Sequence, residues 1–231
     1  MTTLVKICGL RTAAALDAAL DAKADFVGFV FFPPSPRHVE LADASALAAR
    51  VRDRARTVAL TVNADDALLE AIIAALKPNM LQLHGKETPE RVAHLRTTFS
   101  LPVMKALPVE TESDLAAIAD YAGIADWLLF DARAPKDATR PGGLGRPFDW
   151  SLLKALDPGL RFMLSGGLDP ANVAEALTIA QAPAVDVSSG VESEPGIKDP
   201  DKIRAFIRAV RSQNASAKIE KPRNILTGAR S

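Results

Sequence analysis

Two side chains that could exchange protons with a substrate, a thiol and a carboxyl, each stand where a short apolar run ends. Cys8 is the only cysteine and closes the run that begins at Leu4, and Asp131 closes the run that begins at Trp127. A thiolate can remove a proton from carbon when nearby positive charge favours its ionisation. The apolar residues before Asp131 favour a protonated carboxyl, which can act as a general acid. Cys8 is therefore a candidate base and Asp131 a candidate acid, although a structural thiol and a solvated loop carboxylate remain open.

Glycine and serine gather after two later apolar runs. Gly166 and Gly167 follow one run, and Ser189 and Gly190 follow the next. Glycine lets the backbone approach an anion closely. The loops after the seventh and eighth strands of an α/β barrel commonly hold phosphate. The pair of loops predicts a phosphate site, whereas either loop alone could be a simple tight turn.

Other polar side chains stand within predicted strands or in the loops after them. Arg37 lies in a proline-rich loop, where its guanidinium could bind a carboxylate in bidentate fashion or form a surface ion pair. Gln82 and His84 share one face of a run, and His84 could be a metal ligand or a proton shuttle. The three histidines form no recognised zinc motif, so we predict no metal site. Lys6 and Lys105 keep Schiff-base chemistry open, although a structural ion pair is the favoured interpretation.

A third glycine-rich stretch, residues 141–145, ends a long loop after Asp131. Loops of this length are often lids or binding loops, and an ordinary connection would explain it equally well. No Lys-Ser or Lys-Thr pair follows at the spacing of a nucleotide-binding loop, so ATP is not predicted as a ligand.

A scaffold must bring these strand ends together. Short runs rich in Val, Ile, Leu and Phe alternate about eight times with segments of helical periodicity. The predicted strands are 4–8, 26–31, 57–62, 80–84, 102–106, 126–131, 161–165 and 184–188. Eight such units close a barrel, which predicts an α/β single-domain (β/α)8 TIM barrel of the phosphate-binding type over residues 1–212. A doubly wound open sheet is the alternative.

Composition limits the partners and the location. The chain has 231 residues, of which 48% are hydrophobic, and a formal net charge of zero, so we expect neither nucleic acid nor membrane as a partner. A single cysteine excludes an intramolecular disulfide, and no leader or apolar run of membrane-spanning length is present, which predicts a cytoplasmic protein. Residues 213–231 are rich in Lys and Arg with little periodicity and are predicted to be a disordered tail.

Taken together, the motifs resemble the phosphoribosylanthranilate isomerase family of tryptophan biosynthesis. The similar stretches are residues 5–10, 35–37, 81–85, 129–131, 142–145, 148–150, 164–168 and 186–192, in family order. The resemblance covers about residues 4–211. The chain departs from the family pattern at Leu144, where the family often has a small hydroxyl residue.

The resemblance implies an Amadori rearrangement of N-(5-phosphoribosyl)anthranilate without metal or organic cofactor. Asp131 would protonate the ring oxygen of the sugar, and Cys8 would then remove the proton from C2. Arg37 would contact the anthranilate carboxylate. The substrate-binding residues would also include Gln82, His84, Gly166, Gly167, Ser189 and Gly190.

Other activities and assembly states stay open at this point. A Schiff-base aldolase, an indole-forming synthase and a barrel that only binds a phosphosugar are the alternatives. The enzyme could also accept a second isomerase substrate, from histidine biosynthesis, but this alternative is not favoured. The expected assembly is a monomer or a homodimer.

Overall fold

Eight parallel strands form a closed barrel in the computed structural model, which describes residues 2–134 and 147–219, the last four by their backbone alone. The strands are β1 (Leu4–Cys8), β2 (Phe26–Phe31), β3 (Arg56–Thr61), β4 (Met80–Leu83), β5 (Val103–Val109), β6 (Trp127–Ala132), β7 (Phe162–Leu164) and β8 (Ala184–Val187). Pairing of Leu4 with Ala184 brings β1 beside β8 and closes the sheet. The predicted TIM barrel is confirmed, and the open-sheet alternative is wrong.

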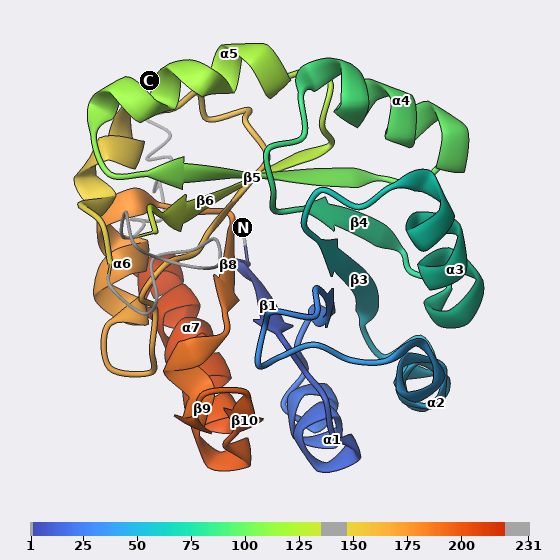
Figure 1. The fold of residues 1–231 in the computed structure, drawn as a ribbon. Helices are drawn as coiled ribbons and strands as arrows, with labels where there is room; N and C mark the ends of the chain where they lie inside the picture. Colours follow the sequence, from blue (N-terminus) through green and yellow to red (C-terminus); the bar gives the residue numbers. More distant parts are fainter. Residues whose placement is uncertain (1, 135–146, 220–231) are drawn as a thin grey trace, which may run out of the picture.

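Helices surround the barrel on its outside (Figure 1). The α-helices are α1 (Ala13–Asp21), α2 (Leu41–Val51), α3 (Asp66–Leu76), α4 (Pro89–Phe99), α5 (Ile118–Tyr121), α6 (Val173–Ala180) and α7 (Pro200–Ile219). Short 3-10 helices are η1 (Glu112–Ala117), η2 (Trp150–Ala155) and η3 (Ser189–Val191), and a hairpin of β9 (Glu192–Glu194) and β10 (Ile197–Lys198) follows η3. Between β6 and β7 the described residues, 133–134 and 147–161, contain one helical element, the short η2.

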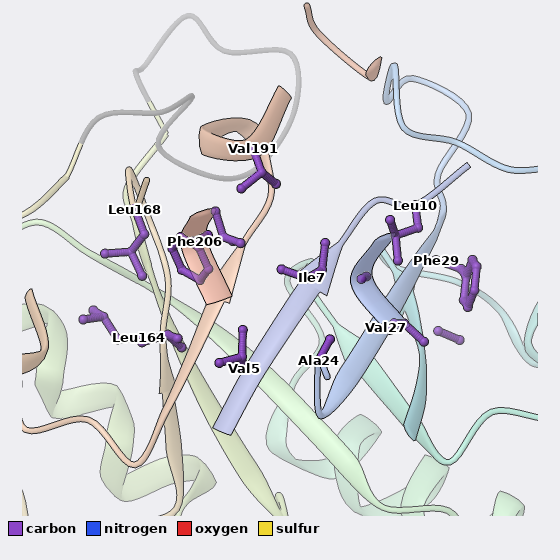
Figure 2. Packing of buried hydrophobic residues seen from close by; sticks show 14 of the residues in the cluster. Val5, Ile7, Leu10, Ala24, Val27, Phe29, Leu164, Leu168, Val191 and Phe206 are labelled. Carbon is purple, nitrogen blue, oxygen red and sulfur yellow. The ribbon is translucent and has the colours of Figure 1, made fainter. Parts of the chain in front are cut away.

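Alternation along the strands separates an outer apolar layer from the barrel interior. Val5 and Ile7 of β1 point outward into the core that also contains Phe206 of α7, as Figure 2 shows. Lys6 and Cys8, the intervening residues, are buried on the inner side, as period two predicts. The amino-terminal part of the interior is filled by a second apolar cluster, whose members are Phe26, Val58, Met80, Met104, Ala106, Leu129, Met163 and Ala184. Polar side chains of the interior begin in mid-strand with Lys6 and Gln82, which are in register with Phe26 and Met104 of this cluster, and continue to the carboxyl ends.

The disordered tail was predicted to begin at residue 213, which is too early. Helix α7 runs on to Ile219, through residues 213–219, which the sequence assigns to the tail. Gln213 donates a hydrogen bond to Thr178 Oγ1 at 2.8 Å, and Asn214 Oδ1 accepts bonds from the N–H and hydroxyl of Thr3 at 3.2 and 3.0 Å. Polar contacts of this kind leave no hydrophobic period in the sequence, which is why the helix was missed.

Two predicted features lie outside the described residues. They are the glycine-rich stretch 141–145 with Leu144, and the last part of the basic segment, residues 220–231. Within the part of the chain that is described, no helix is both long and apolar enough to cross a membrane.

Candidate active site

A cavity of about 340 Å³ opens at the carboxyl ends of the barrel strands. Its size lies within the range of small-molecule sites. Seven of the nine predicted site residues line it, namely Cys8, Arg37, His84, Asp131, Gly166, Gly167 and Ser189. The other two lie just behind: Gln82 is fully buried beneath His84, and Gly190 packs against the loop after β7.

Cys8 ends β1 and is 3% exposed. Its thiol occupies space that Gly28 of β2 leaves open, since a Cβ at position 28 would lie 2.9 Å from Cys8 Sγ. Burial raises the pKa of the Cys8 thiol, and Asp186 adds to this rise, while the neighbouring Lys6 ammonium opposes it. A positive charge that favours the thiolate is therefore present beside Cys8, but it does not outweigh desolvation.

Lys6 makes an ion pair with Asp186 inside the barrel, with 2.9 Å between Nζ and Oδ1. Ser165 donates from its hydroxyl to the other carboxylate oxygen at 3.3 Å. Burial disfavours the charged amine, yet Asp186 and Cys8 hold the pKa of Lys6 above its ordinary value. Lys6 is thus a charged ammonium without a lone pair for a carbonyl, which counts against the Schiff-base alternative.

Lys105 on β5 is also paired with a carboxylate. Its Nζ lies 2.8 Å from Glu87 Oε2 and 2.7 Å from the carbonyl oxygen of Gly85. Both side chains are 3% exposed. The ion pair predicted inside the barrel is confirmed for Lys6. Lys105 also forms a buried ion pair, but it shares the outer face of β5 with Val103, Leu107 and Val109, so the predicted place inside the barrel is wrong for this lysine.

Asp131, near the end of β6, is held by His84 from the loop after β4. His84 Nε2 lies 3.1 Å from Asp131 Oδ2, and His84 Nδ1 lies 3.0 Å from Gln82 Nε2. Because the Gln82 amide donates to Nδ1, the proton of a neutral His84 sits on Nε2 and is donated to Asp131 Oδ2. The three side chains form a line from the buried strand to the cavity.

The loops after β7 and β8 are packed directly on each other and on β6. Gly166 and Gly167 have φ of +84° and +66°, in the left-handed region that favours glycine. A Cβ at Gly166 would lie 2.5 Å from the backbone nitrogen of Ala132, and one at Gly190 would lie 1.9 Å from the carbonyl oxygen of Leu168. Gly190 therefore allows the two predicted phosphate loops to meet.

Arg37 makes a bidentate ion pair with Glu192. Its Nε and Nη2 donate to the two carboxylate oxygens at 2.7 and 2.8 Å. The side chains are 15% and 4% exposed, so the predicted alternative of a surface ion pair is wrong. Gly9, with φ of +79°, provides the space for the Arg37 side chain, since a Cβ there would lie 2.7 Å from Arg37 Cδ.

Sequence reasoning missed two residues of this site, Glu192 and Lys198. Lys198 Nζ lies 2.6 Å from Glu192 Oε1. Burial lowers the pKa of Lys198 to about 8, although Glu192 acts in the opposite direction. Glu192 stood within a motif that we interpreted only as a phosphate loop, and Lys198 stood in no motif.

The closed barrel, the cavity at its carboxyl ends and the paired glycine loops define a TIM-barrel enzyme of the phosphate-binding type. The chain belongs to the N-(5'phosphoribosyl)anthranilate (PRA) isomerase family, whose model matches residues 5–209. The family expected from the motifs is thereby confirmed, and with it an isomerase of tryptophan biosynthesis.

Relatives and solved structures agree with this assignment. The chain is 63% identical over 212 residues to N-(5'-phosphoribosyl)anthranilate isomerase of Rhodopseudomonas palustris (strain BisB18), which covers 92% of this chain and 97% of the relative. It is 61% identical over 220 residues to the isomerase of Bradyrhizobium diazoefficiens, covering 95% and 99%. The crystal structure of phosphoribosyl anthranilate isomerase from Thermotoga maritima matches with a TM-score of 0.82 and 34% identity, over 91% of this chain and 100% of that one.

Proposed function

We propose that this chain catalyses the Amadori rearrangement of N-(5'-phosphoribosyl)anthranilate, with Asp131 as general acid and Cys8 as general base. The observation that carries the proposal is that the carboxyl of β6 and the thiol of β1 line the same cavity. An acid and a base around one bound sugar are what a proton-transfer isomerase requires.

The first step opens the sugar ring. Asp131 gives its proton to the ring oxygen, the bond between C1 and that oxygen breaks, and the nitrogen lone pair forms a protonated C1=N bond. His84 is well placed to hold the Asp131 side chain in position for this transfer. Gln82 would act through His84 rather than by touching the substrate.

The second step moves a proton from carbon. The Cys8 thiolate takes the proton from C2, and the electrons of that bond form C1=C2 while the nitrogen becomes neutral. The enol hydroxyl at C2 then loses its proton and C1 gains one, which gives the aminoketone. The Lys6 ammonium beside Cys8 stabilises the thiolate against the burial that disfavours it.

Two anchors would hold the ends of the substrate. The guanidinium of Arg37 fits the anthranilate carboxylate, and the loops with Gly166, Gly167, Ser189 and Gly190 fit the phosphate. A solved phosphoribosyl anthranilate isomerase contains reduced 1-(o-carboxyphenylamino)-1-deoxyribulose 5-phosphate, a ligand that carries both groups. That protein is 32% identical to this chain and has a TM-score of 0.79. Binding energy from both ends can then orient the reacting carbon atoms.

The chemistry so described uses proton transfers alone, so we propose a reaction without metal or organic cofactor in a cytoplasmic monomer or homodimer. One solved relative is a dimeric isomerase from Thermotoga maritima from which monomers were generated. Light scattering on purified protein distinguishes the two assembly states.

The fluorescence of freshly generated phosphoribosylanthranilate tests the activity. Its decay is followed with wild-type protein and with Cys8→Ala, both in EDTA. Rapid decay with the wild type and little with the variant supports the isomerase and its base together. No decay with the wild type would contradict the proposed reaction, and decay that requires an added metal would contradict its cofactor-free form.

A further inference from the structure

The ammonium group of Lys198 has all of its donors occupied. Nζ donates to the carbonyl oxygen of Ser188 at 2.9 Å, to the Ser188 hydroxyl at 3.1 Å and to Glu192 Oε1 at 2.6 Å. The side chain is 1% exposed. An ammonium has three N–H groups, so none is left for a ligand. Lys198 can therefore influence the substrate only through Glu192 and the loop after β8.

Glu192, which Lys198 holds in place, in turn binds the guanidinium of Arg37. Its two oxygens bind the Nε and Nη2 edge of the guanidinium, which fixes the plane of the group. Within the described residues, Nη1 of Arg37 makes no hydrogen bond, and Arg37 lines the cavity. The edge of the guanidinium that does not face Glu192 can bind one planar carboxylate.

The charges in this group do not cancel. Arg37 and Lys198 each contribute one positive charge, and Glu192 contributes one negative charge between them. All three side chains are largely shielded from solvent, so this single excess charge is weakly screened. It complements one carboxylate.

The hairpin of β9 and β10 also packs on the loop that bears Arg37. Gly196 has φ of +87°, and a Cβ there would lie 2.4 Å from the carbonyl oxygen of Pro36. On its other side the hairpin is tied to α7, since Lys202 Nζ donates to the carbonyl oxygen of Glu192 at 2.7 Å. The hairpin thus lies between a long helix and the loop that bears Arg37, whose position it constrains.

We propose that Glu192 and Lys198 are positioning residues that aim Arg37 at the aromatic carboxylate of the substrate and so set the preference for substrates that carry this group. The inference deepens the proposed function and rests on the role given there to Arg37. It assigns the β9–β10 hairpin to substrate selection, in addition to any part that the preceding loop has in phosphate binding.

A pair of substrates isolates the carboxylate. Ribose 5-phosphate condenses with anthranilate to give the natural glycosylamine and with aniline to give the same compound without the carboxylate. Isomerisation of both is measured by chromatography of the products for wild type, Arg37→Met, Glu192→Gln and Lys198→Met. Glu70→Gln removes an exposed carboxylate on α3 and serves as the control. Because both substrates are measured on each variant, general damage to the protein cancels in their ratio.

The wild type should prefer the anthranilate compound in kcat/KM by roughly tenfold or more. This ratio corresponds to the free energy of one charge-assisted hydrogen bond. Arg37→Met, Glu192→Gln and Lys198→Met should each remove most of it, mainly through KM for the anthranilate compound. The aniline compound should lose much less kcat/KM than the anthranilate compound in each of these variants, and Glu70→Gln should keep the full preference.

The possible failures are distinguishable. If Arg37→Met loses the preference while Glu192→Gln and Lys198→Met keep it, the positioning role is overturned and the proposed function stands. If Arg37→Met keeps the preference, the carboxylate contact itself is wrong and the inference falls with it. Should the charge variants not fold, as judged by circular dichroism, Gly196→Ala displaces the hairpin without changing a charge. Loss of preference in Gly196→Ala supports the inference, and full preference overturns it.

Discussion

Cys8 and Gly28 are register partners on adjacent strands, and the thiol of one fills the space that the other leaves without a side chain. The position of the candidate base is thus set by a residue that offers no functional group. A methyl group at position 28 would meet Sγ at 2.9 Å, Cys8 Cα at 3.2 Å and Lys6 Cε at 3.2 Å. The barrel interior has little room to relax there, because Lys6 is 0% exposed.

Gly28→Ala should therefore displace the thiol and lower kcat by about tenfold or more, since a small misplacement of a reacting group is costly. The free energy of unfolding should fall by about 1–3 kcal/mol, as in other overpacked cores. Kinetics with phosphoribosylanthranilate and urea denaturation measure the two effects. Gly159→Ala is the matched control, since its Cβ would approach only Asp157, a side chain on the surface. Normal kcat in Gly28→Ala would show that the thiol position is not critical.

Cys8→Ala and Asp131→Asn should each lower kcat/KM by at least about a hundredfold, the lower end of acid–base contributions. Both changes preserve or reduce volume, so folding should be retained, as circular dichroism would show. Asp43→Asn, an exposed carboxylate on α2, is the control and should have wild-type activity. Near-normal turnover in either test variant would remove that residue from the mechanism.

Lys6→Met should lower the free energy of unfolding by about 3–5 kcal/mol, because it leaves the Asp186 carboxylate buried without its partner. Lys6→Met combined with Asp186→Leu should be more stable than Lys6→Met alone, since no unpaired charge remains. Urea denaturation of the two variants at neutral pH decides between these expectations. Equal loss in both would mean that packing of the lysine stem, and not the charge, is what stabilises this part of the barrel.

Substrate affinity should fall as the pH rises through about 8. Lys198 is charged below its pKa of about 8 and neutral above it. The titratable groups that face it are Glu192, Arg37 and Cys8, and the raised pKa of Cys8 keeps this group a thiol near pH 8. Loss of the Lys198 proton therefore leaves Arg37 fully balanced by Glu192. KM should therefore increase above pH 8. The raised pKa of Cys8 has the opposite consequence for kcat, which should rise with pH as more thiolate forms.

Separate pH profiles of KM and kcat test this expectation. In Lys198→Met the rise in KM above pH 8 should be absent, while the dependence of kcat on the Cys8 thiolate remains. A rise in KM that persists in Lys198→Met would assign it to another group.

Much of the site could be predicted because it depends on local order along the chain. Period two places Lys6 with Cys8, and Gln82 with His84, on the inner side of their strands. The carboxyl ends of all strands in a closed parallel barrel lie at the same face, so the sequence alone predicts Cys8 and Asp131 in one cavity. The strand bounds themselves agree to within a few residues.

The parts that were missed depend on contacts between distant segments. Arg37 and Glu192 are 155 positions apart and meet only because the hairpin after β8 lies against the loop after β2. The raised pKa of Cys8 results from a balance between burial and the charges of Lys6, Asp186 and Lys198, and a sequence gives the charges without the burial. The last turns of α7 are held by polar contacts to Thr3 and Thr178, which have no hydrophobic signature.

Gly28, Gly166 and Gly190 are each closed in by the atoms that a side chain would meet. Every missense change in a glycine codon adds at least a Cβ, so none of these positions has a mild replacement available by mutation. Under selection for activity, residues around these three glycines should accept substitutions, whereas the three glycines themselves should accept hardly any. The evolutionary freedom of the site is thus limited by residues without a side chain as well as by those that exchange protons.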